Sequence, residues 1–347
     1  MEKNFIKSDN CHPVSLNAQN GCILHTQKGE EIKLGPVLGE GCEGTVFMTY
    51  SHYVAKIYKP RKLSSRKLTK LQALLDKKLY CPGVCLPKAL LYNLKNEFVG
   101  YLMDRAEGEK IRYFYQIDSL REKFPHWNRT DLVKLCIAIL KKIDYLHGKG
   151  IVLGDINLDN ILVKTPEDVY LVDCDSYQVG EYPCPVGTIQ YTPPELQNKG
   201  PYDTYLRSVG NENFAVAVLL FSLMVTGQMP YGWEDDERAR QKIVNMEFAY
   251  PIGQVWNRLP EFLREAFLNT FQKDGCFSAE STRLGASDWL EKFYMYLGML
   301  DTGKYDGQDE IIDWFCVVYM QTESQSMPGG CVSQAKIARE SYFTSND

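Results

Sequence analysis

The sequence predicts an α+β fold in two parts, a small β-rich part followed by a larger helical part. With 347 residues, 44% of them hydrophobic, the chain can bury a large core and is long enough for two domains or one bilobal unit. Short apolar runs between glycine-rich or polar turns predict a sheet over 32–103, and apolar residues at helical spacing predict helices beyond it. The expected divisions are a leading segment 1–30, a β-rich lobe 31–104, a helical lobe 105–297 and a C-terminal extension 298–347.

The β-rich lobe is expected to contain strands and one helix. Leucines at near-helical spacing predict the helix over 63–79, and Pro82 and Gly83 end it. A polar turn, Asn93–Glu97, joins the last two strands into a hairpin. Residues 1–30 are polar and weakly patterned, and no element is assigned to them. The strands are expected at Leu34–Leu38, Val46–Tyr50, Val54–Tyr58, Ala89–Tyr92 and Phe98–Met103.

The helical lobe is expected to begin with an amphipathic helix that is capped by Thr130 or Asp131 and stopped by Gly148. The acidic run 234–237 is interpreted as a surface loop, and the polar residues from Gln321 as a flexible tail. The second expected helix of this lobe, Phe214–Thr226, is almost wholly apolar and should be buried, whereas the helices expected after it are amphipathic. These helices are expected at Phe214–Thr226, Leu259–Phe271, Ser287–Leu297 and Glu310–Met320.

Composition and charge argue against several classes of function. The net charge of −5 gives no indication of nucleic-acid binding. Because no apolar run is long enough to cross a bilayer, we expect no membrane span. The first residues lack a charged region followed by an apolar stretch, so no secretion signal is expected. The 11 cysteines, an odd number without a Cys-x-x-Cys pair, are interpreted as reduced thiols of a cytoplasmic protein.

Two motifs in the β-rich lobe indicate phosphate binding. Gly39, Gly41 and Gly44 form the pattern G-x-G-x-x-G-x-V between two strands, which predicts a hairpin whose backbone N–H groups can approach phosphates. The two glutamates of this loop are poor neighbours for phosphate and are expected to point away. Lys56 lies inside an apolar strand, where an ammonium is costly to bury without a partner such as a nucleotide phosphate. An ordinary hairpin and an edge-strand lysine are the weaker alternatives.

Three polar residues in the helical lobe have the spacing of a phosphoryl-transfer site. Asp155 lies five residues before Asn160, and Asp173 lies thirteen residues after it. Both acids end or follow short apolar runs, where they would be desolvated without benefit to folding alone. Coordination of Mg²⁺ by Asn160 and Asp173 removes that difficulty. Asp155 is then the candidate that accepts or orients the proton of a substrate hydroxyl.

At this point the sequence resembles the eukaryotic-like protein kinases, from about Ile32 to Leu297. The resemblance implies a bilobal kinase fold that uses ATP with Mg²⁺ or Mn²⁺. It places Asp155 on the catalytic aspartate, Asn160 on the catalytic-loop asparagine and Asp173 on the metal-binding aspartate. The resemblance implies that ATP binds below the glycine loop, near a hinge at about Leu102–Ala106. The residues that it implies contact ATP are Gly39, Gly41, Gly44, Val46, Lys56 and Met103.

The activation segment carries the second part of the resemblance. Gly187–Tyr191 matches the family's G-T-x-x-Y, and Pro193–Glu195 matches its A-P-E. The resemblance implies that Thr188 bonds the catalytic aspartate and that Glu195 pairs with a late arginine, here Arg283. Three stretches look more like the bacterial YegI-like branch than like ordinary animal kinases, namely Gly100–Met103, Val172–Tyr177 and Pro185–Thr188.

The chain also departs from the family pattern at its regulatory positions. Gly154 stands where the family has the arginine that grips a phosphorylated activation loop, and Cys184 lies where an activating threonine is common. We therefore predict an enzyme that is not switched on by phosphorylation of that loop. Residues 59–75 contain no acid to pair with the strand lysine, and neither Asp76 nor Gln72 is a convincing substitute. The family's catalytic-loop lysine, D-F-G phenylalanine and buried-helix aspartate are replaced by Asn157, Cys174 and Asn213.

Three classes of function fit these motifs. The favoured one is a Ser/Thr protein kinase, because the activation segment would form a platform for a peptide substrate of unknown identity. A small-molecule phosphotransferase uses a similar aspartate loop but lacks that platform. A pseudokinase that binds nucleotide or partners is supported by the missing helix glutamate. The basic segment 59–78 is interpreted first as a solvated helix face and second as a docking surface for an acidic partner.

Overall fold

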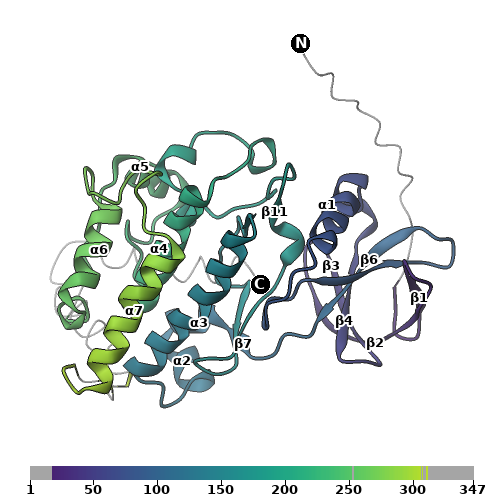
Figure 1. Ribbon diagram of the computed structural model, residues 1–347, viewed down its shortest axis with the longest axis horizontal. Coiled ribbons are helices and arrows are strands. Elements are labelled where there is room, and N and C mark those ends of the chain that lie inside the picture. Colours follow the sequence, from purple (N-terminus) through teal and green to yellow (C-terminus); the bar gives the residue numbers. More distant parts are fainter. Residues whose placement is uncertain (1–17, 252–253, 306, 308–309, 312–347) are drawn as a thin grey trace, which may run out of the picture. The chain divides into compact units, whose positions relative to one another are not determined.

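The computed structural model describes residues 18–251, 254–305, 307 and 310–311 (Figure 1). Its contacts divide the chain into two compact units. The first unit contains the described residues up to Ala106 together with Leu171–Asp175, and the second contains the other described residues. Within the described residues, no helix combines the length and the hydropathy that a membrane crossing requires.

The first unit is a closed antiparallel barrel with strand order β1-β2-β3-β4-β6-β5. Its core contains Leu34, Phe47, Ala55, Leu91 and Leu102, one residue from each of five strands. Burial of these side chains together favours closure of the sheet around them. The elements of this unit are β1 (Ile23–Thr26), β2 (Glu31–Glu40), β3 (Gly44–Thr49), β4 (Tyr53–Tyr58), α1 (Ser65–Asp76), β5 (Pro87–Tyr92) and β6 (Phe98–Asp104). The five predicted strands and the predicted helix are therefore present.

Strand β1 was not predicted, although it closes the barrel. It pairs with β2 on one side and with β5 on the other, where His25 lies opposite Tyr92. Leu24 and Thr26 point inward and are 1% exposed, whereas Ile23 is 42% exposed. With only four residues and a threonine on the inner face, the strand has too little hydrophobic alternation to stand out in the sequence.

The second unit is mainly helical and contains two small sheets. The sheets have the strand orders β10-β9-β7 and β11-β8, and the last residue of β10 belongs to the first unit. The strands are β7 (Glu109–Lys110), β8 (Ile151–Val152), β9 (Ile161–Val163), β10 (Val169–Leu171) and β11 (Gln178–Val179). The helices are α2 (Ile117–Lys123), α3 (Arg129–Gly148), α4 (Val209–Met224), α5 (Asp236–Asn245), α6 (Glu261–Phe271) and α7 (Ala286–Asp301).

Helix α4 forms the centre of the second unit, as its apolar sequence predicts. Every residue from Asn211 to Met224 is buried. The helix packs against α3 and α6, and the Phe221 ring contacts the rings of Phe267 and Phe271 on α6 edge to face. Such aromatic contacts add to the stabilisation from buried area. A buried central helix gives the loops around it a rigid support.

Three expectations for the helical lobe need correction or fall outside the structure. Helix α3 is capped by Asn128, not by Thr130 or Asp131, because the Asn128 side chain accepts the N–H of Asp131 and the Asp131 carboxylate accepts the N–H of Asn128. The acidic run is not only a loop, since Asp235 caps α5 and the next two acids form its first turn. Of the expected helix Glu310–Met320, all but the first two residues lie outside the described residues.

Candidate active site

The glycine motif forms the predicted hairpin between β2 and β3. Gly39 pairs with Val46, and the N–H of Gly41 donates to the Gly44 carbonyl at 2.9 Å. Gly44 must be glycine, because a Cβ atom there would lie 2.4 Å from the Ile57 carbonyl oxygen on β4. The motif is therefore a tight hairpin held directly against the strand that carries Lys56.

The two glutamates of this hairpin bind lysines. Glu43 pairs with Lys67 of α1 at 2.7 Å, and Glu40 pairs with Lys59 at 3.1 Å. These ion pairs neutralise carboxylates that would otherwise repel a phosphate. They also engage two of the cations in the basic segment 59–78, so the acidic docking partner for that segment stays a prediction.

Lys56 lies on β4, directly opposite Val46 of β3. It is 7% exposed, which rules out the edge-strand alternative in which the lysine points into water. Met103, also predicted to contact ATP, is buried on β6 opposite Val54. The structure thus places the predicted contacts Val46, Lys56 and Met103 on three neighbouring strands of the barrel.

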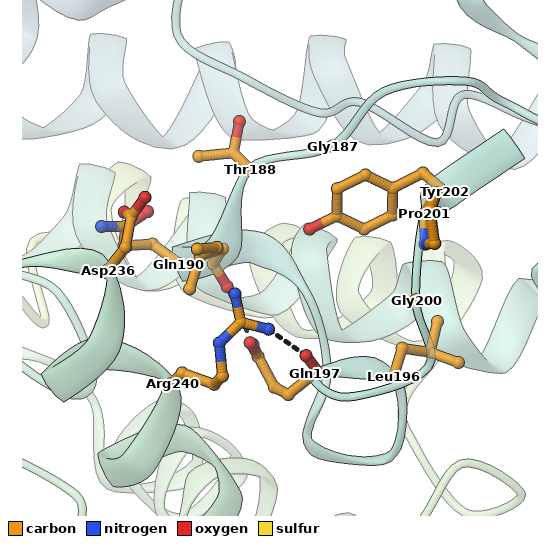
Figure 2. Close-up of a pocket in the computed structure, with 11 residues that line it drawn as sticks. Gly187, Thr188, Gln190, Leu196, Gln197, Gly200, Pro201, Tyr202, Asp236 and Arg240 are labelled. Carbon is orange, nitrogen blue, oxygen red and sulfur yellow. Dashed lines mark hydrogen bonds between the residues drawn. The ribbon is translucent and has the colours of Figure 1, made fainter.

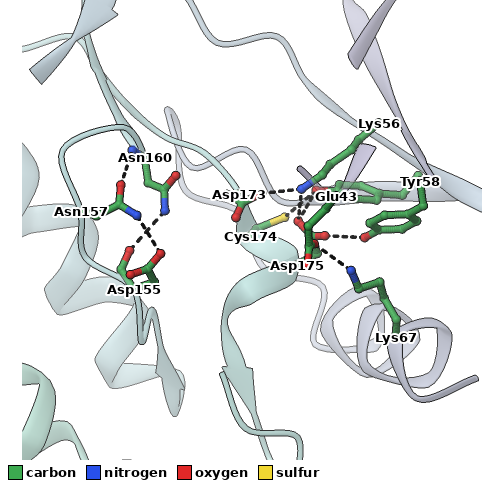
Figure 3. Close-up of polar contacts among 11 residues, drawn as sticks. Glu43, Lys56, Tyr58, Lys67, Asp155, Asn157, Asn160, Asp173, Cys174 and Asp175 are labelled. Atoms are coloured by element: carbon green, nitrogen blue, oxygen red, sulfur yellow. Dashed lines mark hydrogen bonds and ion pairs between the residues drawn. The ribbon is translucent and has the colours of Figure 1, made fainter. Parts of the chain in front are cut away.

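The partners of Lys56 are two aspartates that follow β10. Its Nζ donates to the Asp173 carboxylate and, at 2.8 Å, to the Asp175 carboxylate (Figure 3). Asp175 also accepts the hydroxyls of Tyr58 at 2.6 Å and Tyr101 at 2.9 Å. Neither substitute considered for the missing helix glutamate is used, because Gln72 and Asp76 bond each other at the exposed surface. Sequence reasoning missed Asp175, although an acid at the glycine position of D-F-G was a visible signal.

Burial and the charges of neighbouring side chains shift the pKa values of Lys56, Asp175 and Asp173. Burial alone would lower the pKa of Lys56, but the carboxylates of Asp175 and Asp173 raise it above its ordinary value. Burial would raise the pKa of Asp175, but the charge and hydrogen bonds of Lys56 hold it well below its usual range. Burial, together with the charge of Asp175, raises the pKa of Asp173 to about 6. Lys56 is therefore paired with both carboxylates, of which Asp175 is the more buried and Asp173 the more exposed.

The residues present fit a bound divalent cation. Two carboxylates face one ammonium, and Glu43 and Lys67 neutralise each other, so the cluster keeps one excess negative charge. Asp173 has a left-handed backbone, φ 63°, which turns its partly exposed carboxylate away from regular strand geometry. No three His, Cys, Asp or Glu side chains gather into a metal cluster in the described parts of the chain. A magnesium site with one carboxylate, water and nucleotide oxygens needs no such cluster.

In the second unit, the loop between β8 and β9 carries Asp155, Asn157 and Asn160 (Figure 3). The Asn157 amide donates to the Asp155 carboxylate at 2.7 Å, and its oxygen accepts the N–H of Asn160 at 3.1 Å. The Asn160 amide donates to the Asp155 carbonyl at 3.3 Å, which leaves its oxygen as the atom suited to a cation. Asn157, treated in the sequence as the loss of a lysine, is therefore the residue that orients the Asp155 carboxylate.

The activation segment reaches Asp155 through Thr188. The Thr188 hydroxyl donates to the Asp155 carboxylate at 3.4 Å, which is the contact that the resemblance implies. Burial raises the pKa of Asp155, against the opposing effects of the Asn157 bond and the Arg207 charge. A carboxylate with a raised pKa is better matched to accepting a proton than an exposed one.

The Glu195–Arg283 pair predicted from the sequence is present. Arg283 donates to the two carboxylate oxygens of Glu195 at 2.5 and 2.8 Å. Burial alone would raise the pKa of Glu195, but the hydrogen bonds and charge of Arg283 lower it below its ordinary value. Asn211 of α4 adds a third bond at 2.9 Å. The end of the activation segment is thereby fixed to the central helix.

The start of α4 supports the Asp155 loop, but through Glu212 and not through Asn213. The buried Glu212 carboxylate accepts the N–H groups of Leu153 and Gly154 at 2.9 and 3.1 Å. His147 lies 3.4 Å from the same carboxylate, so it belongs to the packing of this support. The Asn213 side-chain oxygen has no hydrogen-bond partner among the described residues. The expectation that Asn213 replaces the family's helix aspartate is therefore wrong by one position. The carboxylate that accepts the backbone N–H groups of the Asp155 loop belongs to the preceding residue, Glu212.

We predict that Glu212→Ala lowers the free energy of unfolding by about 2–5 kcal/mol, because it leaves two backbone N–H groups without an acceptor. Chemical denaturation measures this loss. Asn213→Ala is the matched control on the adjacent position and should cost clearly less. Equal losses for the two variants would show that Glu212 is ordinary packing.

Comparisons with known proteins agree with this geometry. Residues 32–295 match the protein kinase domain family. The chain is 32% identical over 294 residues to protein kinase YegI of Escherichia coli O157:H7, an alignment that covers 77% of this chain and 45% of that protein. It is 26% identical over 289 residues to the serine/threonine-protein kinase PKH2 of Saccharomyces cerevisiae, covering 73% of this chain and 25% of that protein.

A third relative is 3-phosphoinositide-dependent protein kinase 1 of Rattus norvegicus, 23% identical over 261 residues, which cover 69% of this chain and 42% of that protein. The chain thus spans less than half the length of these curated relatives. The match to the domain covers most of the chain and includes both the Lys56 cluster and the Asp155 loop. The chain therefore belongs to the protein kinase domain family.

Proposed function

We propose that this chain is an ATP-dependent protein kinase that transfers the γ-phosphate of ATP to a serine or threonine hydroxyl of a protein. The observation that carries the proposal is the Asp155 carboxylate, oriented by Asn157 and bonded by Thr188 of the activation segment. Protein kinases as a family use ATP and a divalent metal, and Mg²⁺ is the metal we propose here. The proposed serine/threonine specificity is supported by the similarity to PKH2, which is a serine/threonine-protein kinase by name.

The first unit supplies the proposed phosphate contacts. The N–H groups of the 39–44 hairpin and the buried ammonium of Lys56 are the donors for the phosphates. Asn160 and Asp173 are the proposed metal ligands, and the metal, when bound, neutralises charge on the phosphates. Asp155 orients the acceptor hydroxyl and takes its proton as the oxygen attacks. Catalysis then rests on positioning and electrostatics, as in phosphoryl transfer generally.

A pocket beside Thr188 supports a protein acceptor over a small molecule. It has a volume of about 470 Å³. Figure 2 shows Asp236 and Arg240 of α5 on one side of it, and Thr188 and Tyr202 on the other. Arg240 is tied to the carbonyl oxygen of Gln197, which keeps the wall in place. A small-molecule phosphotransferase has no need for an acceptor site built from an activation segment.

Contacts of Gly154 and Arg207 support the proposal that the activation segment needs no phosphate. Gly154 has φ 76°, and a Cβ atom there would lie 2.3 Å from the Cβ of the buried Cys184, so the family's arginine does not fit. Arg207 supplies a cation instead. Its guanidinium donates to the Val186 carbonyl at 2.5 Å, and its backbone exchanges two hydrogen bonds with the Gln178 side chain, both at 2.7 Å. This arrangement supports a kinase that needs no activating phosphorylation.

The pseudokinase alternative was supported by the missing helix glutamate and by Gly154, and the first of these arguments is weakened because Asp175 pairs with Lys56. A scaffold that only binds partners has no physical need for an oriented Asp155. The alternative is kept as an outcome of the following experiment.

We predict that the purified chain incorporates labelled phosphate from ATP into a generic protein substrate, on serine or threonine, in the presence of Mg²⁺. Asp155→Ala and Asp173→Ala should each abolish labelling, because one removes the hydroxyl-orienting carboxylate and the other a metal ligand. Asp236→Ala, which changes only the pocket wall, should retain transfer and alter the choice of peptide. Nucleotide binding without labelling by the wild type would favour the pseudokinase.

We also predict that phosphatase treatment leaves the activity unchanged. Among the hydroxyl side chains of 176–186, Ser176 and Tyr177 are buried, so Tyr182→Phe removes the accessible one and should also be neutral. Arg207→Ala should lower kcat/KM roughly tenfold or more, because a hydrogen bond from a charged donor contributes about 1.5–3 kcal/mol. An enzyme that is inactivated by phosphatase, or by Tyr182→Phe, contradicts the absence of loop control.

A further inference from the structure

Helix α1 contains no side chain able to act as counter-ion of Lys56. Its one acid, Asp76, lies at the last turn, is exposed and is bonded to Gln72 at 2.8 Å. The residue that faces the hairpin from this helix is a cation, Lys67, paired with Glu43. The helix therefore has the wrong charge to hold an ammonium, and the counter-ion must come from elsewhere in the unit.

Asp175 meets every requirement of that counter-ion. It is 3% exposed, and Lys56, Tyr58 and Tyr101 all donate to it within 2.9 Å. These three residues come from β4 and β6, two paired strands of the barrel, so the carboxylate is held from a rigid surface. The buried Asp175 carboxylate is tolerated because its hydrogen-bond donors are in place. The same carboxylate without Lys56 would strongly destabilise the protein.

The short segment that carries Asp175 is itself fastened to the barrel unit. The N–H of Cys85 donates to the Leu171 carbonyl at 2.9 Å, and the N–H of Leu171 donates to the Gly83 carbonyl at 2.7 Å. Val84 and Leu171 form a parallel bridge, although Leu171 lies far from Val84 in sequence. Residues Leu171–Asp175 thus belong to the first unit, together with the lysine that Asp175 binds.

We infer that Asp175 is the positioning residue of Lys56, and that it holds the ammonium toward the phosphates in place of a carboxylate from helix α1. The inference rests on the proposed function and specifies how its phosphate-binding half is assembled. Asp173 is less suited to this role, because its side chain is 34% exposed. In the proposed function it is also the ligand of the metal. Asp175 is a poor metal ligand, since its side chain is 1% exposed and surrounded by donors.

A double-mutant cycle tests the inference. The variants are Asp175→Asn, Lys56→Met and the combination, and the readouts are the affinity for Mg²⁺ with a fluorescent ATP analogue and the Tm of the nucleotide-free protein. Each single variant should weaken nucleotide binding by roughly 10- to 100-fold, the range for removing a residue that orients a ligand. The combination should be no weaker than Lys56→Met alone, because Asp175 acts only through the lysine. In Tm, Asp175→Asn should cost several degrees in the wild-type background and far less beside Lys56→Met.

Two further variants keep the test decisive. Asp76→Asn removes the one acid of α1 and should leave both readouts unchanged. Tyr101→Phe removes a hydroxyl that orients Asp175 but keeps both charges, so it should give a smaller loss of affinity that vanishes beside Lys56→Met, even if Asp175→Asn does not fold. Additive losses in the cycle, or an effect of Asp76→Asn equal to that of Asp175→Asn, would overturn the inference. Neither readout requires phosphoryl transfer, so failure of the proposed kinase activity would appear separately, in the Asp155→Ala comparison.

Discussion

The ion pair between Lys56 and Asp175 is the interaction on which the proposed phosphate site of the barrel unit depends. A lysine inside a β-barrel is tolerated only when a carboxylate compensates the lost hydration of its ammonium. The barrel strands supply the lysine and the two tyrosine hydroxyls, and the segment after β10 supplies the acid. Because Asp175 takes up the charge of Lys56, the neighbouring Asp173 is left with negative charge to offer a cation. In the proposed site, the buried Asp175 therefore holds the lysine, and Asp173 is left to bind the metal.

The second unit also relies on buried polar side chains to hold its loops in place. Glu212 fixes the backbone of the Asp155 loop, and Arg207 fixes the activation segment at Gln178 and Val186. A permanent guanidinium does not depend on a phosphate that must be added and removed. The glycine at 154 is the consequence, since Cys184 packs where a side chain at that position would lie. These contacts are the basis for the proposal that the segment needs no activating phosphorylation.

Much of the fold could be predicted from hydrophobic patterns, and the site only in part. The glycine hairpin, Lys56 and the Asp155 loop were predicted from motifs with a characteristic spacing, and the Glu195–Arg283 pair was implied by the family resemblance. Strand β1 was missed because four residues with one inward leucine carry too little periodicity. Asp175 and Glu212 were missed for a different reason. Each of them stands at a different position from the acid that the family pattern leads one to expect. When the expected acid is absent, sequence spacing does not show which other acid reaches the buried donors.

The most direct measurement is a crystal structure of the chain with Mg²⁺ and a non-hydrolysable ATP analogue. The account predicts that the Lys56 ammonium lies within hydrogen-bond distance of both the Asp175 carboxylate and a phosphate oxygen, while Asp173 contacts the metal. The three donors to the Asp175 carboxylate, Lys56, Tyr58 and Tyr101, should be the same as in the nucleotide-free protein. A structure in which Lys56 is held by a side chain of α1, or in which Asp175 has moved onto the metal, would contradict the account.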